Sequence, residues 1–143
     1  MPFTNPSTAA IHELLRRART IAVVGLSDNP DRPSHEVATA LLAHGYRVIP
    51  VNPGLAEWQG IRAVPDLDHL SEVLAPGEQV DIVDVFRRPE HVAAIVDDCI
   101  RLKLPALWLQ LGIVDEAAAQ RAVAAGITVI MNRCMKVERD RMG

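Results

Sequence analysis

The 143-residue chain is poor in cysteine and in aromatic residues, and it has no excess of basic charge. Two cysteines without a spacing pattern are too few for a disulfide framework or a zinc site with four cysteine ligands, so we expect reduced thiols. Aromatic residues make up 3% of the chain, and the formal net charge is −3. These values argue against nucleic acid as a partner, because its binding sites need stacking surfaces and a cationic field.

The sequence also lacks long hydrophobic runs. The longest apolar stretches, such as residues 104–109, are far shorter than a bilayer span, and the N-terminus lacks the charged-then-apolar pattern of a signal peptide. We therefore expect a cytoplasmic protein without a membrane partner. Hydrophobic residues make up 49% and charged residues 23%, which suits one globular domain over residues 1–143. The sequence is compatible with a homo-oligomer.

Strand-like and helix-like patterns alternate along the chain. Short apolar or β-branched runs predict five strands, at residues 20–25, 46–51, 80–86, 105–109 and 127–131. Apolar residues at helical spacing predict helices at residues 8–18, 34–44, 92–100 and 116–125, with Ser34 and Asp115 as N-caps. Residues 55–76 are the least readable part, with a short strand near 62–64 and a weak helix over 66–74.

This alternation predicts an α/β fold, a single Rossmann-like doubly wound parallel sheet with helices on both faces. Right-handed crossovers between parallel strands leave the helices outside the sheet. We expect about five strands in the order 3-2-1-4-5. Ligands bind such sheets beyond the carboxyl ends of the strands, where the strand order reverses, so the functional residues are sought in the loops that follow the strands.

The loop after the first strand, residues 25–34, leads into a predicted helix. A helix N-terminus exposes unpaired N–H groups and a partial positive charge, and Gly25 and Ser27 are small enough to let a phosphate approach. The dinucleotide fingerprint G-x-G-x-x-G is only partly present, because Ser27 and Pro30 replace its later glycines. By itself the loop fits a phosphate site and a proline-rich connection about equally well.

The other strand ends favour binding over catalysis. Asn52 follows the second strand, where NAD-binding sheets place an acidic residue. The neutral side chain is compatible with a ligand whose ribose carries a phosphate, and the segment is also compatible with a plain Asn-Pro-Gly turn that binds nothing. Arg87 and Arg88 are suited to phosphate, or are surface charge. Gln110 follows the fourth strand, and Cys134, which a bound thiol could approach, follows the fifth. These ends hold no carboxylate pair, metal-ligand cluster or evident base.

Five motifs in order resemble the small bacterial and archaeal CoA-binding proteins. They lie at residues 21–34, 45–53, 80–87, 107–113 and 132–135, and they cover nearly the whole chain. The family looks like the CoA-binding domain at the front of the succinyl-CoA synthetase α subunit. The resemblance implies that the first loop contacts the phosphates of coenzyme A, that residues 51–53 border its adenosine, and that the third and fourth strand ends line the crevice.

The predicted cofactor-binding set combines this resemblance with the strand-end positions. It comprises Gly25, Leu26, Ser27, Arg32, Pro33, Ser34, Val51, Asn52, Pro53, Val85, Phe86, Arg87, Arg88, Gln110, Gly112, Ile113, Asn132, Arg133 and Cys134. The synthetase has a further domain with a phosphorylated histidine, for which this chain has no room, so no ligase activity is expected. The predicted function is binding of CoA or an acyl-CoA, without catalysis and without a metal. The alternatives are an NAD(H)-binding redox sensor and a thioester-handling enzyme that uses Cys134.

Overall fold

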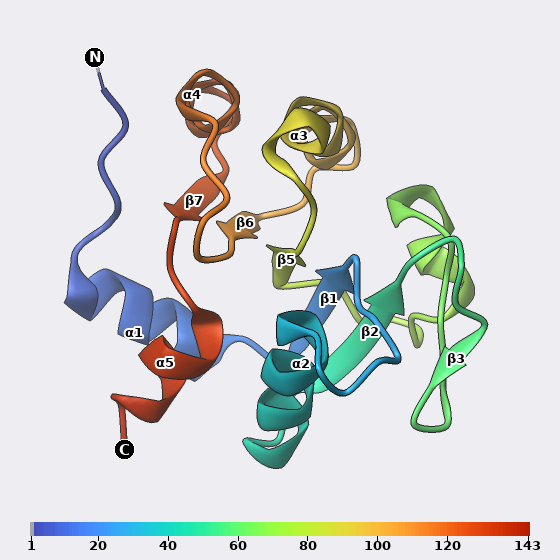
Figure 1. Ribbon diagram of the computed structural model, residues 1–143. Helices are drawn as coiled ribbons and strands as arrows, with labels where there is room; N and C mark the ends of the chain where they lie inside the picture. The colour runs from blue at the N-terminus through green and yellow to red at the C-terminus, as the bar shows by residue number, and fades with distance from the viewer. Residues whose placement is uncertain (1) are drawn as a thin grey trace.

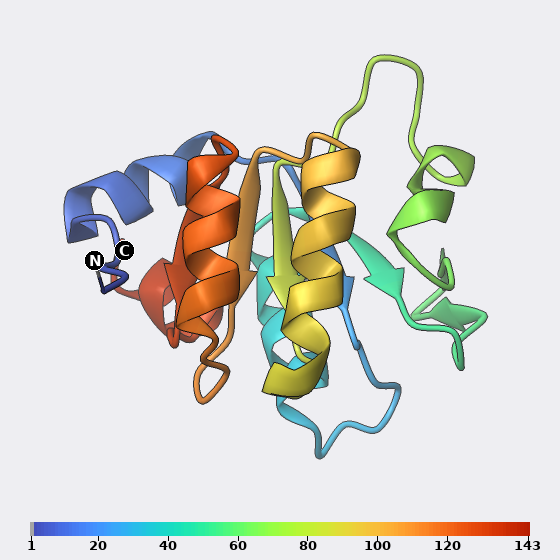
Figure 2. The same cartoon turned by 90° about the horizontal axis from the view of Figure 1, so that it is seen from above.

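The computed structural model describes residues 2–143 as three layers with a parallel sheet in the middle (Figure 1). The sheet strands are β1 (Thr20–Val24), β2 (Arg47–Val51), β5 (Ile82–Val85), β6 (Ala106–Leu109) and β7 (Thr128–Met131). One face is covered by α1 (Thr8–Arg17), α2 (Pro33–Ala43) and α5 (Met135–Asp140). The opposite face is covered by the 3-10 helix η1 (Leu67–Glu72), α3 (Val92–Arg101) and α4 (Glu116–Ala124). Figure 2 shows α3 and α4 side by side over that face.

The predicted Rossmann-like α/β class is confirmed, and the strands are ordered β2-β1-β5-β6-β7 with every neighbouring pair parallel. The order reverses beside β1, as in a 3-2-1-4-5 pattern. The outer position next to β2 is held by Val64, which bridges to Val51 in parallel. Residues 80–86, predicted as the third strand, instead contribute β5 on the other side of β1. β5 is buried along its whole length, so it needs partners on both edges, whereas the outer position takes only a short segment.

The region between β2 and β5 contains more structure than its sequence pattern indicates. β3 (Glu57–Trp58) and β4 (Ile61–Arg62) form a small antiparallel hairpin. The weak helix predicted over 66–74 is the 3-10 helix η1. A second 3-10 turn, η2 (Pro89–His91), connects the loop after β5 to α3.

The helices begin close to their predicted positions, with one correction. Asp115 caps α4 as predicted, and its carboxylate accepts a hydrogen bond from the Ala118 amide at 3.0 Å. Ser34 is not the N-cap of α2, because Arg32 holds that position and Pro33 begins the helix. Proline fits the first helical position, where an N–H would have no partner within the helix. α5, of 6 residues, was not predicted.

Alternate strand residues point to opposite faces and build two apolar cores, one on each side of the sheet. Asp84 in β5 is the exception to the apolar pattern. Its side chain is fully buried between the register partners Val23 and Trp108, and neither carboxylate oxygen has a hydrogen-bond partner in the described part of the chain. Burial raises the pKa of Asp84 well above its usual range, so the folded protein holds this carboxyl in its neutral form at pH values where an exposed aspartate is ionised.

Candidate functional site

The loop after β1 approaches the loop after β5 so closely that only glycine fits at its start. Gly25 has a φ of +87°, and a Cβ at this position would lie 2.4 Å from the carbonyl oxygen of Phe86. The amide of Gly25 donates to the carbonyl of Val51 at 2.8 Å, which holds it against the end of β2. Gly25 therefore joins the carboxyl ends of three neighbouring strands.

Side-chain hydrogen bonds fix the rest of this loop. The buried hydroxyl of Ser34 accepts from the Ser27 amide at 3.0 Å, so the first turn of α2 holds the loop in place. The Ser27 hydroxyl accepts from the Asn29 amide at 3.1 Å, and the Asn29 side chain accepts from the Asp31 amide at 3.0 Å. The loop has a defined shape even though it lacks the later glycines of the dinucleotide fingerprint.

Two asparagines at strand ends connect neighbouring loops. The amide nitrogen of Asn52 donates to the carbonyl of Leu26 at 2.9 Å, and its oxygen accepts from the amide of Gly54 at 2.9 Å. Asn132, with a φ of +61°, accepts from the Gly112 amide at 2.8 Å. Both side chains are engaged with backbone, so we assign them a structural part in shaping the site.

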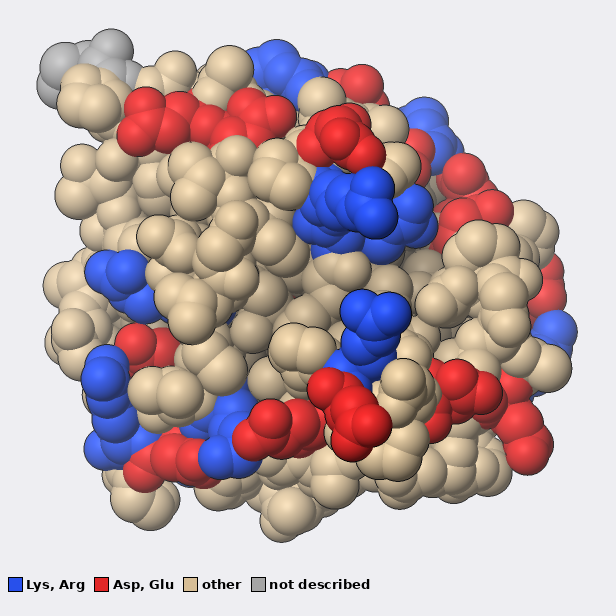
Figure 3. All heavy atoms as spheres, viewed as in Figure 1, with Lys and Arg blue, Asp and Glu red and all other residues tan. Residues whose placement is uncertain are grey.

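A pocket of about 780 Å³ opens at the carboxyl ends of β1, β5, β6 and β7, between the first turn of α2 and α5. This is within the size range of small-molecule and cofactor sites. Figure 3 shows a hollow near the middle of this face, with basic side chains next to it. The lining residues are Gly25, Ser27, Arg32, Pro33, Ser34, Glu36, Val37, Phe86, Arg87, Arg88, Pro89, Gln110, Leu111, Gly112, Ile113, Cys134, Lys136 and Val137.

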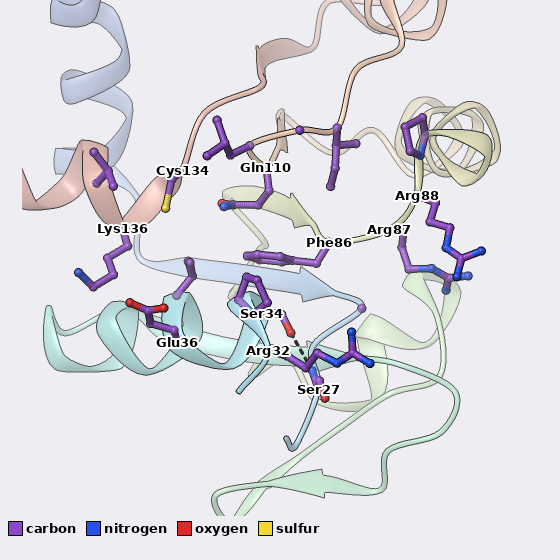
Figure 4. A pocket seen from close by; sticks show the side chains of 18 residues that line it. Ser27, Arg32, Ser34, Glu36, Phe86, Arg87, Arg88, Gln110, Cys134 and Lys136 are labelled. Atoms are coloured by element: carbon purple, nitrogen blue, oxygen red, sulfur yellow. Dashed lines mark hydrogen bonds between the residues drawn. The ribbon is translucent and has the colours of Figure 1, made fainter. Parts of the chain in front are cut away.

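The pocket has a cationic end and a mixed end. Figure 4 shows the guanidinium groups of Arg32, Arg87 and Arg88 on one side, and Cys134 and Lys136 on the other. Among residues 2–143, no carboxylate forms an ion pair with Arg32 or Arg87, and the single pair of Arg88, with Glu90, is long at 3.9 Å. The cationic end therefore has donors free for an anionic ligand.

Gln110 and Phe86 lie between these two ends (Figure 4). Gln110 is buried, and its side-chain oxygen accepts from the Met135 amide at 3.1 Å, so the start of α5 fixes its orientation. Lys136 on α5 donates to the Asp140 carboxylate at 3.0 Å, and this hydrogen bond raises its pKa. Lys136 therefore places a positive charge at the rim beside Cys134.

A smaller hollow of about 170 Å³ lies on the opposite face of the sheet, at the ends of β1 and β2. Val51, Pro53 and Ile95 contribute apolar walls, and Asp66 and Asp98 contribute carboxylates. Arg87 lines both this hollow and the larger pocket, so the two sites adjoin at its side chain.

Most of the predicted site residues line one of these two sites. The larger pocket is lined by Gly25, Ser27, Arg32, Pro33, Ser34, Phe86, Arg87, Arg88, Gln110, Gly112, Ile113 and Cys134, and the smaller hollow by Val51 and Pro53. The predicted residues that line neither are Leu26, Asn52, Val85, Asn132 and Arg133. Leu26 and Val85 are fully buried, each in the core on one face of the sheet.

Sequence reasoning predicted the first two residues of α2 but missed its other pocket residues and the contribution of α5. Glu36 lies in the first turn of α2 and Val37 follows it, whereas Lys136 and Val137 come from α5. Leu111 and Pro89 were also missed, although they lie next to predicted residues in the same loops. Of the missed pocket residues, only these two could have been predicted from their neighbours in the sequence. Within residues 2–143, no helix has the length and apolarity needed to cross a bilayer. No cluster of three or more His, Cys, Asp or Glu side chains in that range is placed to hold a metal ion.

A parallel sheet with helices on both faces and a pocket at the switch in strand order defines the class of Rossmann-like α/β proteins. Residues 19–140 match the family described as CoA binding domain, and the chain belongs to that family. The predicted family resemblance is thereby confirmed.

Several known proteins are similar to this chain in sequence or in fold. The chain is 46% identical over 133 residues to the uncharacterized protein YneT of Bacillus subtilis (strain 168), covering 93% of this chain and 94% of that protein. The structure of cell-free ID.343 from Thermus thermophilus is 36% identical with a TM-score of 0.87, covering 96% of this chain and all of the other. The dinucleotide-forming acetyl-coenzyme A synthetase 1 of Ca. Korarchaeum cryptofilum shares the fold, at 24% identity and a TM-score of 0.69 over 84% of this chain and 27% of the synthetase.

Proposed function

We propose that the protein binds coenzyme A or an acyl-CoA in the larger pocket, as a binding module without chemistry of its own. The observation that carries this proposal is the surplus of positive charge at one end of the pocket, where Arg32 and Arg87 have no carboxylate partner within residues 2–143. Coenzyme A brings a diphosphate and a 3′-phosphate, which match that surplus. Membership in the CoA binding domain family supports the same ligand.

The phosphates fit the junction of the loops after β1 and β5. Gly25 has no side chain there, and the Arg87 side chain is next to it, with its Cδ 3.1 Å from the position of a Cβ on Gly25. A phosphate at this junction is within reach of guanidinium groups, which donate paired hydrogen bonds to it. The start of α2 adds the partial positive charge of a helix N-terminus.

The two ends of the ligand would then run in opposite directions from the phosphates. The smaller hollow, with the apolar walls of Val51 and Pro53, is placed for the nucleoside. The pantetheine arm would cross Phe86 toward Gln110 and Cys134 in the larger pocket. Arg87 lines both sites, so it is the residue we expect to contact phosphate in any such pose.

Isothermal titration with CoA and with dephospho-CoA tests the proposal. We expect heat with both ligands, and tighter binding of CoA if arginines bind the 3′-phosphate. Arg87→Ala should weaken CoA by about ten- to a hundredfold, since a hydrogen bond to a charged group contributes about 1.5–3 kcal/mol. The matched control is Arg16→Ala on α1, which removes an exposed arginine that does not line the pocket. No heat with either ligand at millimolar concentration would refute the function.

An NAD(H)-binding redox sensor is the alternative, and the contacts of Asn52 argue against it. NAD-binding sheets use an acidic side chain after the second strand to bind the ribose hydroxyls. Here the position holds Asn52, whose nitrogen and oxygen are both engaged with backbone. Titration with NADH, followed by its fluorescence, should therefore give no saturable signal. Saturable NADH binding tighter than that of CoA would favour the sensor.

A further inference from the structure

The mixed end of the pocket carries a thiol that phosphate binding does not use. Cys134 is half-buried at the start of α5 and lines the pocket opposite the arginines (Figure 4). Lys136 lines the same rim, and its ammonium group pairs with the Asp140 carboxylate at 3.0 Å. A thiol that opens into a ligand pocket is accessible to a bound reagent, whereas a thiol buried in the core is not.

Gln110 gives this end of the pocket a hydrogen-bond donor. Its side chain is only 4% exposed, and its oxygen is committed to the Met135 amide. Its amide nitrogen donates no hydrogen bond to any residue in the described part of the chain. Figure 4 shows the end of this side chain directed toward Cys134. A donor without a protein partner on the wall of a pocket is free to bind a ligand, and the arm of CoA carries amide carbonyls that can accept from it.

The second cysteine of the chain provides an internal contrast. Cys99 on α3 is fully buried in the core on the opposite face of the sheet. Burial raises the pKa of its thiol to about 12, so Cys99 holds its proton and is shielded from reagents. Any thiol chemistry of the folded protein is therefore confined to Cys134.

We propose that Cys134 is a redox modification site that takes up CoA as a mixed disulfide. This inference rests on the proposed function. A ligand with its phosphates at Arg87 has its thiol end directed past Phe86 to Cys134, and the Gln110 amide positions the arm by donating to one of its carbonyls. The reagent is a CoA disulfide, which supplies the oxidising equivalents itself. Binding converts a reaction between two molecules in solution into one between groups held side by side.

The exchange step balances without any other oxidant. Cys134 loses its proton, and the thiolate attacks the sulfur of the bound CoA half. A Cys134–CoA disulfide bond forms as the original disulfide bond breaks, and the second thiol leaves as a thiolate that takes up a proton. The protein gains the mass of one CoA less two hydrogen atoms. A reducing thiol reverses the step.

Intact-mass spectrometry after incubation with CoA disulfide or with glutathione disulfide tests the inference. Both reagents carry disulfides, but glutathione lacks the nucleotide that would bind at Arg87. We expect a single CoA adduct that forms at least about tenfold faster than the glutathione adduct at equal subsaturating concentration. Arg87→Ala should remove this rate difference. Cys134→Ala should give no adduct, whereas Cys99→Ala, checked for folding by circular dichroism, should give the same adduct as the natural chain.

Three results would overturn the inference, and a separate titration shows whether CoA binding fails with it. Equal rates for the two disulfides, no adduct on the natural chain, or an adduct located on Cys99 would overturn the inference. Titration of the natural chain with reduced CoA in the presence of a reducing agent separates this failure from failure of the proposed function. Heat of binding without an adduct rejects the modification site alone, while the absence of both rejects CoA binding as well.

Discussion

The neutral carboxyl of Asp84 gives a sharp prediction about the pH dependence of stability. Asp84 is fully buried in β5 and both of its oxygens lack partners within residues 2–143, so the folded state raises its pKa well above the usual range. The unfolded chain releases this proton above about pH 4. Between that pH and the pKa in the folded state, the folded protein binds one proton more than the unfolded chain.

The free energy of unfolding must therefore fall as pH rises through this window. The contribution of Asp84 is fully present below its unfolded pKa and is lost progressively up to its folded pKa, with a slope of about 1.4 kcal/mol per pH unit. The decline continues until the pH reaches the pKa of Asp84 in the folded state. Asp84→Asn keeps the shape of the side chain and removes the titration.

Urea unfolding followed by circular dichroism at pH 4.5, 5.5, 6.5 and 7.5 measures the effect. The difference between Asp84→Asn and the natural chain isolates Asp84, because all other titrating groups are shared. The variant should gain stability relative to the natural chain as pH rises from 4.5 toward the pKa of Asp84 in the folded state. Val85→Ala is the control, since it removes buried apolar volume from the same strand and should lower stability equally at every pH. Parallel curves for Asp84→Asn and the natural chain would contradict the reasoning.

Three further predictions concern the loop after β1 and one surface ion pair. Gly25→Ala should destabilise the fold by more than about 1 kcal/mol, seen as a lower thermal midpoint, because its φ is positive and a Cβ would meet a carbonyl oxygen at 2.4 Å. Ser34→Ala should cost about 1–3 kcal/mol in urea unfolding and weaken CoA in calorimetry, since the Ser27 amide loses its acceptor. The hydrogen bond to Asp66 raises the pKa of His69, so this pair stabilises the fold below the unfolded pKa of histidine and less as pH rises. Asp66→Asn should lower the His69 pKa measured by NMR titration, and an unchanged value would exclude the pair.

Local patterns were enough to predict the strands and the loops that follow them. β1, β2, β5, β6 and β7 each lie within a predicted apolar run, because a strand covered on both faces must be apolar throughout. The position of the loop residues at the carboxyl edge then follows from the parallel arrangement. The same reasoning placed residues 80–86 at the wrong position in the sheet, since strand order depends on contacts between distant segments.

The site illustrates the same division between local and tertiary information. Gly25, Arg87 and Gln110 were predicted from their positions after strands, and all three line the pocket. Asn52 has equally suggestive chemistry, but its amide binds the backbone of the neighbouring loop. Lys136 was missed because α5 is a short helix with a weak pattern, and only its packing against α1 and α2 brings it to the rim.

Periodicity and short motifs were sufficient to predict the α/β class, the strand-end positions of the candidate residues and the family. Tertiary structure decided which strand-end side chains meet, because their convergence depends on strand order and on the crossing loops. It also decided their partners, since a free arginine and an ion-paired one look the same in a sequence. Asp84 is the clearest case, because alternation places it inward while only the packing around it leaves its carboxyl without a partner.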